Sequence, residues 1–356
     1  MRRYAPVVLV SIAATLVLGC DAKTLEPVHR PGDPLTARGG GTTTGFATLT
    51  ALPALSKSVH GEAYTVNQAG LIGGYSWDQG GYMHPVTWSF QNGAWRITAY
   101  PWDATATSAV IRAVNDAGDK AGTFWPASAP RAVIWHATGG YTVLGCGELG
   151  QAYGMSAEGQ VVVGGDPNVS QGVAVVWRPG TCREALPPIV AGTWARAQAV
   201  NRDGTIVGGT SNGVPVRWTR TGGGWQVTQL DSRPGSVIGS NRQGDLVGSV
   251  DVVPCSANSC SRAIIWFAAG GSRELPTLGG PFTWPRGINA AKEVVGMSGL
   301  PNGNAVPVIW SDAHGMRQLP GSGWAFGVSD ARPDGTRMVV GAGGKNFGAQ
   351  VWVVKP

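Results

Sequence analysis

The sequence predicts an all-β repeat protein, a seven-bladed β-propeller built of four-stranded antiparallel blades. Three observations predict this fold: a turn motif that recurs along the chain, a tryptophan that follows each turn, and the composition. Charged residues make up 13% of the 356 residues, and the chain contains 55 Gly and 15 Trp. This composition is typical of many short strands joined by tight turns and not of helices.

The recurring turn begins with Asn or Ser and usually ends with Gly, as in Asn201-Arg-Asp-Gly204. An Asn or Ser side chain can bond its own backbone at the start of a four-residue hairpin turn, and Gly accepts a positive φ. One copy has Lys292 at the Gly position. We expect a different turn there, because Lys in the left-handed region costs about 1 kcal/mol. The copies begin at Asn67, Asn115, Ser156, Asn201, Asn241, Asn289 and Ser329.

A Trp closes a third apolar run after each turn, and a fourth short run follows it. Four strands per unit, repeated at roughly 44 residues, are typical of a propeller blade. One Trp per blade at one register indicates a packing residue. These residues are Trp88, Trp135, Trp177, Trp218, Trp266, Trp310 and Trp352.

The last unit ends at Pro356 and lacks a fourth strand. A run from Phe46 to Pro53, ahead of the first unit, resembles the fourth strands of other units. Pairing this run with the strand through Trp352 would hide two sheet edges and hold the termini together. We therefore expect residues 45–356 to form a single propeller, closed by an N-terminal strand that completes the last blade.

Residues 1–19 are predicted to be a lipoprotein signal peptide, with a basic start and an apolar run too short to span a bilayer. Val17-Leu18-Gly19-Cys20 resembles the lipobox of bacterial lipoproteins, which implies lipidation of Cys20; a plain secretory leader is the alternative. Residues 20–44 comprise this Cys and a Pro- and Gly-rich stretch that predicts a flexible linker. The expected location is outside the cytoplasm, with the chain lipid-anchored to the bacterial cell envelope on the periplasmic side or the cell surface.

The repeat itself resembles a known family. Gly287-Ile-Asn289, then Val294-Val-Gly296 and an apolar run ending in Trp, is similar to the HAF repeat of extracellular bacterial proteins, and the similarity covers residues 58–356. The family's His-Ala-Phe before the Trp is mostly absent here, and only His84-Pro-Val-Thr-Trp88 keeps a His. The resemblance implies secretion and a repeat fold, and it implies no settled activity.

The cysteines predict disulfides. With Cys20 lipidated, an even number remains in an exported chain. Cys255 and Cys260 lie in one long loop and are expected to pair. Cys146 and Cys182 lie beside the fourth strands of neighbouring units, which favours a bridge between two blades. We expect no metal site, because the His residues are scattered, and no cofactor.

The first strand of each unit can be aligned by counting back from the Asn or Ser of the turn. The second residue back is always small, as close packing of blade on blade demands. The third is large and varied. Because the first strand of a propeller lines the central channel, these residues are candidates for ligand binding; simple filling of the channel is the alternative. They are Tyr64, Arg112, Tyr153, Gln198, Ile238, Arg286 and Phe326.

A second candidate site comes from the links between strands. In a propeller, the links between units and those between second and third strands lie on one face. Six of the eight Trp outside the repeat register fall in these links, where they could stack on sugar rings or grip an apolar partner. The alternative is that the rings fold inward as a lid over the core. The six are Trp77, Trp102, Trp125, Trp194, Trp284 and Trp324.

The sequence favours a binding module over an enzyme. The formal charge of +6 comes from scattered Lys and Arg, which argues against a nucleic-acid partner. Most carboxylates lie in turns. We therefore expect a monomeric, membrane-tethered binding or scaffold module that recognises a polysaccharide or an envelope protein. The alternative is a carbohydrate-active hydrolase or lyase, which would need paired carboxyl groups about 5–10 Å apart.

Overall fold

The structure is a computed structural model that describes residues 35–37, 42–57, 60–166, 172–253 and 260–355. Cys20 and the rest of the predicted leader lie outside the described residues. The chain divides into two units, residues 1–30 and residues 31–356, and every described residue belongs to the second. Within the described ranges, no helix is present that could cross a membrane.

Most strands form antiparallel groups of four in which each strand pairs with the next, and a single parallel bridge between Met83 and Ser108 joins the first two groups. Each group is named here by its first strand. The first three groups are β4 (Gly61–Val66), β5 (Ile72–Trp77), β6 (Met83–Gln91) and β7 (Ala94–Ala99); β8 (Ala106–Val114), β9 (Lys120–Pro126), β10 (Arg131–Trp135) and β11 (Tyr141–Val143); and β12 (Gln151–Met155), β13 (Val162–Asp166), β14 (Val173–Trp177) and β15 (Glu184–Ala185).

The remaining groups follow the same pattern, except that an N-terminal strand completes the β28 group. They are β16 (Ala195–Val200), β17 (Ile206–Ser211), β18 (Val214–Thr221) and β19 (Gly224–Gln229); β20 (Gly235–Ser240), β21 (Leu246–Asp251), β22 (Ser261–Trp266) and β23 (Ser272–Glu274); β24 (Thr283–Ile288), β25 (Val294–Gly299), β26 (Ala305–Ser311) and β27 (Gly315–Gln318); and β28 (Trp324–Val328), β29 (Arg337–Gly343), β30 (Gly348–Val354) and β3 (Ala47–Ala51).

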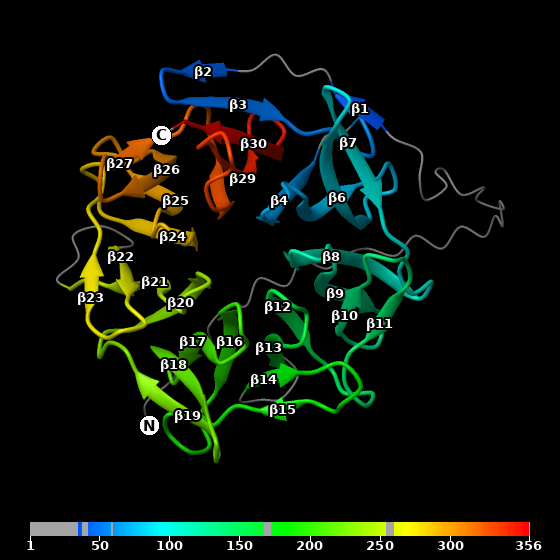
Figure 1. The fold of residues 1–356 in the computed structure, drawn as a ribbon, viewed down its shortest axis with the longest axis vertical. Coiled ribbons are helices and arrows are strands. Elements are labelled where there is room, and N and C mark those ends of the chain that lie inside the picture. The colour runs from blue at the N-terminus through cyan, green and yellow to red at the C-terminus, as the bar shows by residue number, and fades with distance from the viewer. Residues whose placement is uncertain (1–34, 38–41, 58–59, 167–171, 254–259, 356) are drawn as a thin grey trace, which may run out of the picture. The chain divides into compact units, whose positions relative to one another are not determined.

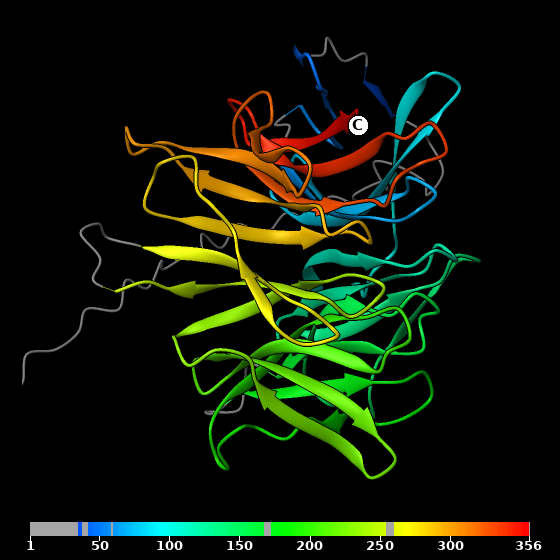
Figure 2. The ribbon, with the colours of Figure 1, turned by 60° about the vertical axis from the view of Figure 1, so that its left-hand side comes forward.

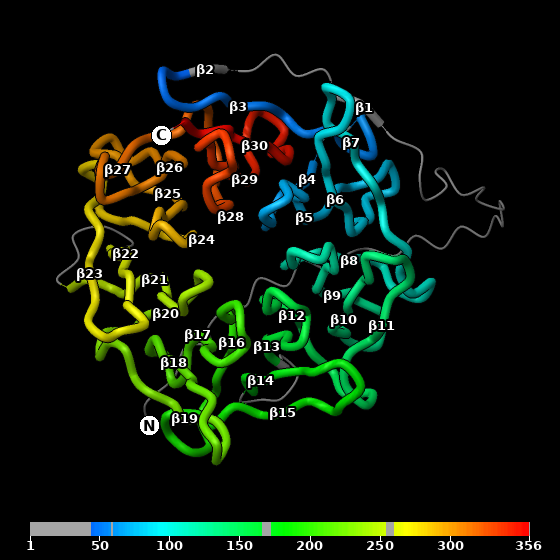
Figure 3. The backbone as a smooth tube through the Cα atoms, viewed as in Figure 1, coloured from blue at the N-terminus to red at the C-terminus, as the bar shows by residue number. Residues whose placement is uncertain are grey.

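Within the second unit, the groups follow one another around a common centre (Figure 1). The first strands, including β28, lie nearest this centre, and the fourth strands lie outermost (Figure 3). Neighbouring groups pack together: β5 contacts β8, β13 contacts β16, and β29 contacts β4. The view in Figure 2 shows neighbouring sheets turned face to face.

The apolar core lies between these sheets. Val163 of the β12 group, for example, packs in one cluster with Val207 and Trp218 of the β16 group. The repeat Trp residues are the largest members of the core, and each is at most 6% exposed. This confirms the prediction that they are packing residues. Their burial removes large apolar surfaces from water on both sides of every sheet.

Several repeat Trp residues also join one group to the one before it. The indole Nε1 of Trp88 donates a hydrogen bond to the carbonyl of Pro53, at 2.7 Å. Trp218 Nε1 does the same to Pro187, also at 2.7 Å. Each acceptor lies just after the fourth strand of the preceding group. The bond satisfies a buried indole N–H and helps to fix how one sheet sits on the next. The indole N–H groups of Trp177 and Trp266 have no such partner among the described residues.

The predicted pairing of the N-terminal run with the strand through Trp352 is present. β3 runs antiparallel to β30, with Leu49 opposite Trp352. The predicted linker also contains two short strands: β1 (Leu35–Ala37), which pairs with β7, and β2 (Thr42–Thr44), which pairs with β3. The outer edges of these sheets carry unpaired backbone groups, which extended residues can satisfy.

The recurring turns have the predicted geometry. Asn201 Oδ1 accepts a hydrogen bond from Thr205 N at 2.9 Å, and Gly204 has a φ of +69°. The expectation of a different turn at Lys292 is wrong. Its φ is +63°, and its N–H donates to Asn289 O at 2.9 Å as in the other turns. Lys292 Nζ lies 5.5 Å from the ring centroid of Phe267, a contact that offsets part of the strain.

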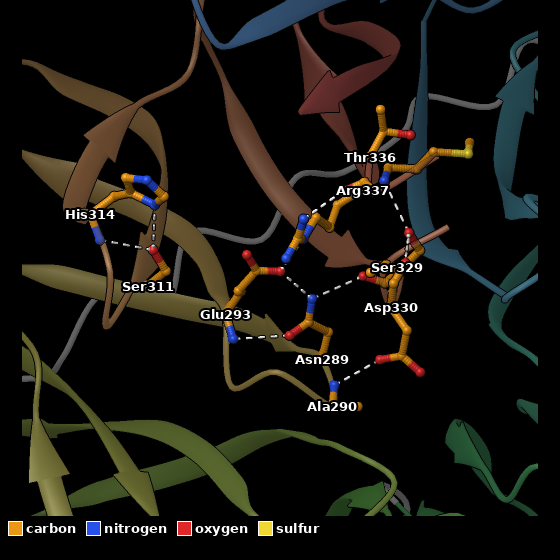
Figure 4. A network of polar contacts seen from close by, with 12 residues as sticks. Asn289, Ala290, Glu293, Ser311, His314, Ser329, Asp330, Thr336 and Arg337 are labelled. Atoms are coloured by element: carbon orange, nitrogen blue, oxygen red, sulfur yellow. Dashed lines mark hydrogen bonds and ion pairs between the residues drawn. The ribbon is translucent and has the colours of Figure 1, made fainter. Parts of the chain in front are cut away.

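The same turns also connect neighbouring groups, as Figure 4 shows for the β24 and β28 groups. Asn289 Nδ2 donates to Ser329 O at 3.0 Å, and Ala290 N donates to Asp330 Oδ1 at 2.7 Å. Equivalent bonds run from Asn67 to Asn115 and from Asn241 to Asn289. One amide therefore closes its own turn through its oxygen and reaches the next sheet through its nitrogen.

A disulfide joins Cys146 to Cys182, with the two Cα atoms 4.9 Å apart. It confirms the predicted bridge between neighbouring groups, since Cys146 follows β11 and Cys182 precedes β15. Cys260 is also disulfide-bonded, and its predicted partner Cys255 lies outside the described residues.

The turn at Lys292 generates a stability prediction. Replacing Lys292 by Gly should raise the free energy of unfolding by about 0.5–1 kcal/mol, because Gly adopts a positive φ without steric cost. Urea denaturation would measure the change. The reverse substitution, Gly118→Lys, is the control. Gly118 has a φ of +89°, and only Ala137 lies near an added Cβ, so the variant should lose stability through its backbone conformation. If both substitutions lowered stability equally, the backbone explanation would be wrong.

Candidate functional site

One cavity, about 540 Å³ in volume, is bordered by first strands of all the groups. The cavity is lined by all seven candidate residues that the sequence places three positions before the turn. Glu62, Trp324 and Phe347 complete the lining. The full set is Glu62, Tyr64, Arg112, Tyr153, Gln198, Ile238, Arg286, Trp324, Phe326 and Phe347.

A β-bulge at one register explains why these side chains meet. In β4 the pairing with β5 shifts between Ala63 and Thr65, which leaves Tyr64 as the extra residue. The first strand of every other group shifts at the same position, so Arg112, Tyr153, Gln198, Ile238, Arg286 and Phe326 are the extra residues there. A bulge bends the strand and redirects the side chain of the extra residue, in this case toward the shared cavity.

The small residue after each bulge lets the next group approach. A Cβ added to Gly327 would lie 2.8 Å from the carbonyl oxygen of Tyr64, and one added to Gly287 would lie 2.9 Å from that of Phe326. The backbone at one bulge therefore packs directly on the bulge of the following group. This confirms the packing reason predicted for the small position.

A partial further ring of site residues lies two positions earlier in most first strands; in β8 this position is Val110, which is buried in the core. Side chains two apart in a strand share a face, so this ring continues the cavity wall outward. It contributes Glu62 and Trp324 to the lining. Other residues of this ring bond to lining residues: Gln151 Oε1 accepts from Tyr153 OH at 2.5 Å, and Ser236 Oγ donates to Gln198 Oε1 at 2.6 Å. Sequence analysis missed this ring, although extending the strand's alternation by one step would have found it.

Aromatic rings form a continuous wall on one side of the cavity. Trp284 and Trp324 stack with ring centroids 5.8 Å apart and an interplanar angle of 12°, and Phe326 follows Trp324 at 6.2 Å and 16°. Phe282 stacks on the outer side of Trp284 at 4.1 Å, and Tyr64 contacts Phe326 at 5.2 Å. The wall crosses from the β24 group through the β28 group to the β4 group.

Two guanidinium groups lie against this wall. The Cζ of Arg112 is 4.0 Å from the ring centroid of Tyr64, and that of Arg286 is 5.2 Å from the centroid of Trp324. Burial, followed by repulsion from Arg112, lowers the pKa of Arg286. Burial, followed by the negative charge of Glu62, raises the pKa of the Tyr75 phenol to about 12. Both shifts reflect the burial of groups in or beside the cavity wall.

The other predicted aromatic residues lie along the same rim of the sheets but away from the cavity. Trp102 stacks on His84 at 4.3 Å and packs against the core of the β8 group. Trp194 is 41% exposed and Trp77 is 38% exposed. Trp125 lies near the end of β9 and is partly exposed. The expected single aromatic face is thus divided, and only Trp284 and Trp324 join the aromatic wall of the cavity.

The opposite end of the first strands is crossed by one side chain. Arg242 Nε lies 2.7 Å from Asp330 Oδ2, and its Nη2 lies 2.8 Å from Asp116 Oδ2 and 3.1 Å from Gln68 Oε1. These partners belong to the turns of the β28, β8 and β4 groups, whereas Arg242 comes from the turn of the β20 group. The side chain therefore ties separate groups together and narrows this end, where the remaining pocket has a volume of about 180 Å³.

Comparisons with known proteins agree with this architecture. No family model matches the sequence, and no curated protein matches it. The chain is similar to the virginiamycin B lyase of Staphylococcus aureus, with a TM-score of 0.56 and 12% identity over 87% of this chain and 99% of the lyase. It is also similar to a streptogramin B lyase, with a TM-score of 0.55 and 14% identity over 87% of this chain and 98% of the lyase. A third similar structure is YCF48 bound to a D1 peptide, with a TM-score of 0.53 and 10% identity over 89% of this chain and 99% of YCF48. At such identities the similarity concerns the fold alone, and the chain is a β-propeller of four-stranded antiparallel sheets.

Arg242 generates a prediction about coupling between groups. A double-mutant cycle of Arg242→Ala with Asp116→Asn should give a coupling energy of about 0.5–1 kcal/mol, because the pair is partly exposed. The coupling should shrink when salt is raised to about 1 M. Arg202→Ala, on a neighbouring turn of the same pocket, is the control and should show no coupling to Asp116. A coupling that salt leaves unchanged would contradict an ionic tie.

Tyr75 generates a prediction about pH. Its pKa is about 12 in the folded chain against 10.0 for an unperturbed tyrosine. Between these values the unfolded chain releases the proton and the folded chain keeps it, so the free energy of unfolding should fall as pH rises from 10 to 12. Below pH 10 this contribution is fully present. Tyr75→Phe should flatten the fall in denaturation experiments, whereas Tyr82→Phe, which changes an exposed ring, should leave it; equal slopes for both variants would contradict the assignment.

Proposed function

We propose that the protein is a ligand-binding module of the bacterial cell envelope, a seven-bladed propeller that recognises a carbohydrate or protein partner through its central cavity. The observation that carries the proposal is the cavity itself, into which every first strand turns one bulged side chain. A wall of stacked rings beside charged groups is the usual composition of a binding site. Filling of the channel alone would require neither the aromatic wall nor the two guanidinium groups.

The seven-bladed, closed ring is part of the proposal. Contacts between neighbouring groups run from β4 to β8, β12, β16, β20, β24 and β28 and return to β4. The pairing of β3 with β30 supplies the fourth strand of the last blade from the N-terminal end. Closure of this kind turns the free edges of the first strands into the ring, where other chains cannot pair with them, and holds the cavity residues at fixed distances.

The envelope location rests on sequence features. The resemblance of residues 17–20 to a lipobox supports a lipid anchor on Cys20, and the HAF-like repeats support secretion. A disulfide between two blades suits an oxidising compartment. We propose that the anchor holds the propeller at the membrane, where envelope polysaccharides and proteins are available to it.

The carboxylate positions favour binding over glycoside hydrolysis. Glu62 is the single carboxylate among the described lining residues of the cavity, whereas hydrolysis needs a pair. Other carboxylates are held elsewhere: Asp116 and Asp330 are paired with Arg242. Glu184 pairs with Arg178 at 2.6 Å. The hydrolase or lyase alternative therefore has no acid and base positioned together in the described cavity.

A glycan array and a pull-down from envelope extract, each run with matched variants, would test the proposal. Trp324→Ala removes part of the aromatic wall and should abolish retention of the ligand. Trp194→Ala removes an exposed ring of the same rim, remote from the cavity lining, and should leave retention unchanged. Thermal unfolding of both variants shows whether a loss of binding is a loss of fold. Retention that survives Trp324→Ala but not Trp194→Ala would place the site elsewhere, and no retention in either assay would remove the proposal.

A further inference from the structure

The charge of the cavity is unbalanced. Arg112 and Arg286 line it together with a single carboxylate, Glu62. Neither guanidinium makes a hydrogen bond or an ion pair with any residue of the described ranges, and the Nε of Arg286 is buried without a partner. A buried donor without a partner is costly, and a buried positive charge more so. A ligand group of opposite charge in the cavity would supply the missing partner.

The aromatic contacts orient these donors. A guanidinium stacked on a ring face keeps its N–H edge free in its own plane, and this edge matches the two oxygens of a carboxylate. The Cζ of Arg112 lies over the ring of Tyr64, and that of Arg286 lies over the ring of Trp324. Both residues line the same cavity, and repulsion between the two cations contributes to the lowered pKa of Arg286. A single carboxylate placed there would accept from both.

The remaining groups fit a hydroxylated ring. Gln198 uses its Oε1 to accept from Ser236, which leaves its amide N–H groups to donate. Glu62 can accept a hydrogen bond from a hydroxyl. Its charge also disfavours a dianion such as phosphate, because a second negative charge on the ligand would face it. Trp324 and Phe326 offer ring faces and edges to the C–H surface of a sugar.

We propose that the cavity binds an acidic sugar unit, a uronic acid of an envelope or extracellular polysaccharide, with its carboxylate held between Arg112 and Arg286. The inference rests on the proposed function as a binding module. The sugar ring lies along the aromatic wall, and its hydroxyl groups bond to Glu62 and Gln198. Because Arg242 crosses the far end, the unit enters from the wide end.

The test compares an oligogalacturonate with its methyl ester, in which a methyl group caps each carboxylate and removes its charge, by calorimetry with the full chain. The acid should bind at least about tenfold tighter than the ester, as a charge-assisted bidentate contact predicts. Arg286→Gln should lower affinity for the acid by about tenfold or more and change affinity for the ester by less than about twofold. Arg202→Gln, at the opposite end, is the control and should change neither affinity.

A second variant guards against loss of fold in Arg286→Gln. Arg112→Lys keeps the positive charge and removes the planar fork, so it should also weaken binding of the acid selectively, with thermal unfolding close to that of the wild type. Equal affinities for acid and ester would overturn the acidic-sugar proposal, and so would tighter binding of N-acetylalanine, whose carboxylate belongs to a peptide unit. If the ester bound equally well and the binding depended on Trp324, the binding module would stand without the acidic sugar. No binding to any glycan or envelope protein would remove both proposals.

Discussion

The β-bulge in each first strand is the feature on which the rest of the architecture depends. It occurs at one register in every group, as between Ala63 and Thr65. It turns a large side chain toward the centre and brings the adjacent small residue against the carbonyl of the next bulge, as Gly327 lies against Tyr64. Packing and site formation are therefore coupled: the contact that seats one sheet on the next also places the side chains that line the cavity. A larger residue in place of Gly327 would therefore disturb both the packing of the two sheets and the position of the cavity side chains.

Much of this arrangement could be predicted from the sequence because it depends on local chemistry. The turn at Asn201 needs an amide and a positive φ, which Asn and Gly supply wherever they occur. The buried position of Trp218 could be predicted because a Trp recurs at the same place in every repeat of the sequence. The pairing of β3 with β30 followed from counting strands. The last unit lacked a fourth strand, and the run from Phe46 to Pro53 belonged to no unit. Each of these inferences uses residues close together in sequence or a simple count.

The rest depends on distances that sequence does not contain. The stacking of Trp324 on Phe326 joins a link residue to the predicted channel residues. Because sequence spacing does not give this contact, Trp324 was assigned to the rim and not to the cavity. Arg242 meets Asp116 and Asp330 across separate groups, which no sequence spacing could indicate. Lys292 shows the limit of local rules: the hydrogen bond of its own turn, and the bonds from Asn289 and Ala290 to the next sheet, hold it in a conformation that its own preference opposes.

The crossing of one end by Arg242 determines how a polymer could be recognised. A cavity open at both ends would allow a chain to thread through and be held along its length. A cavity narrowed at one end accepts a chain by its terminus or by a side branch. For such a protein, the number of binding sites on a polysaccharide scales with its free ends and branches and not with its mass. Trimming a long chain into short ones would therefore multiply the sites without adding any material.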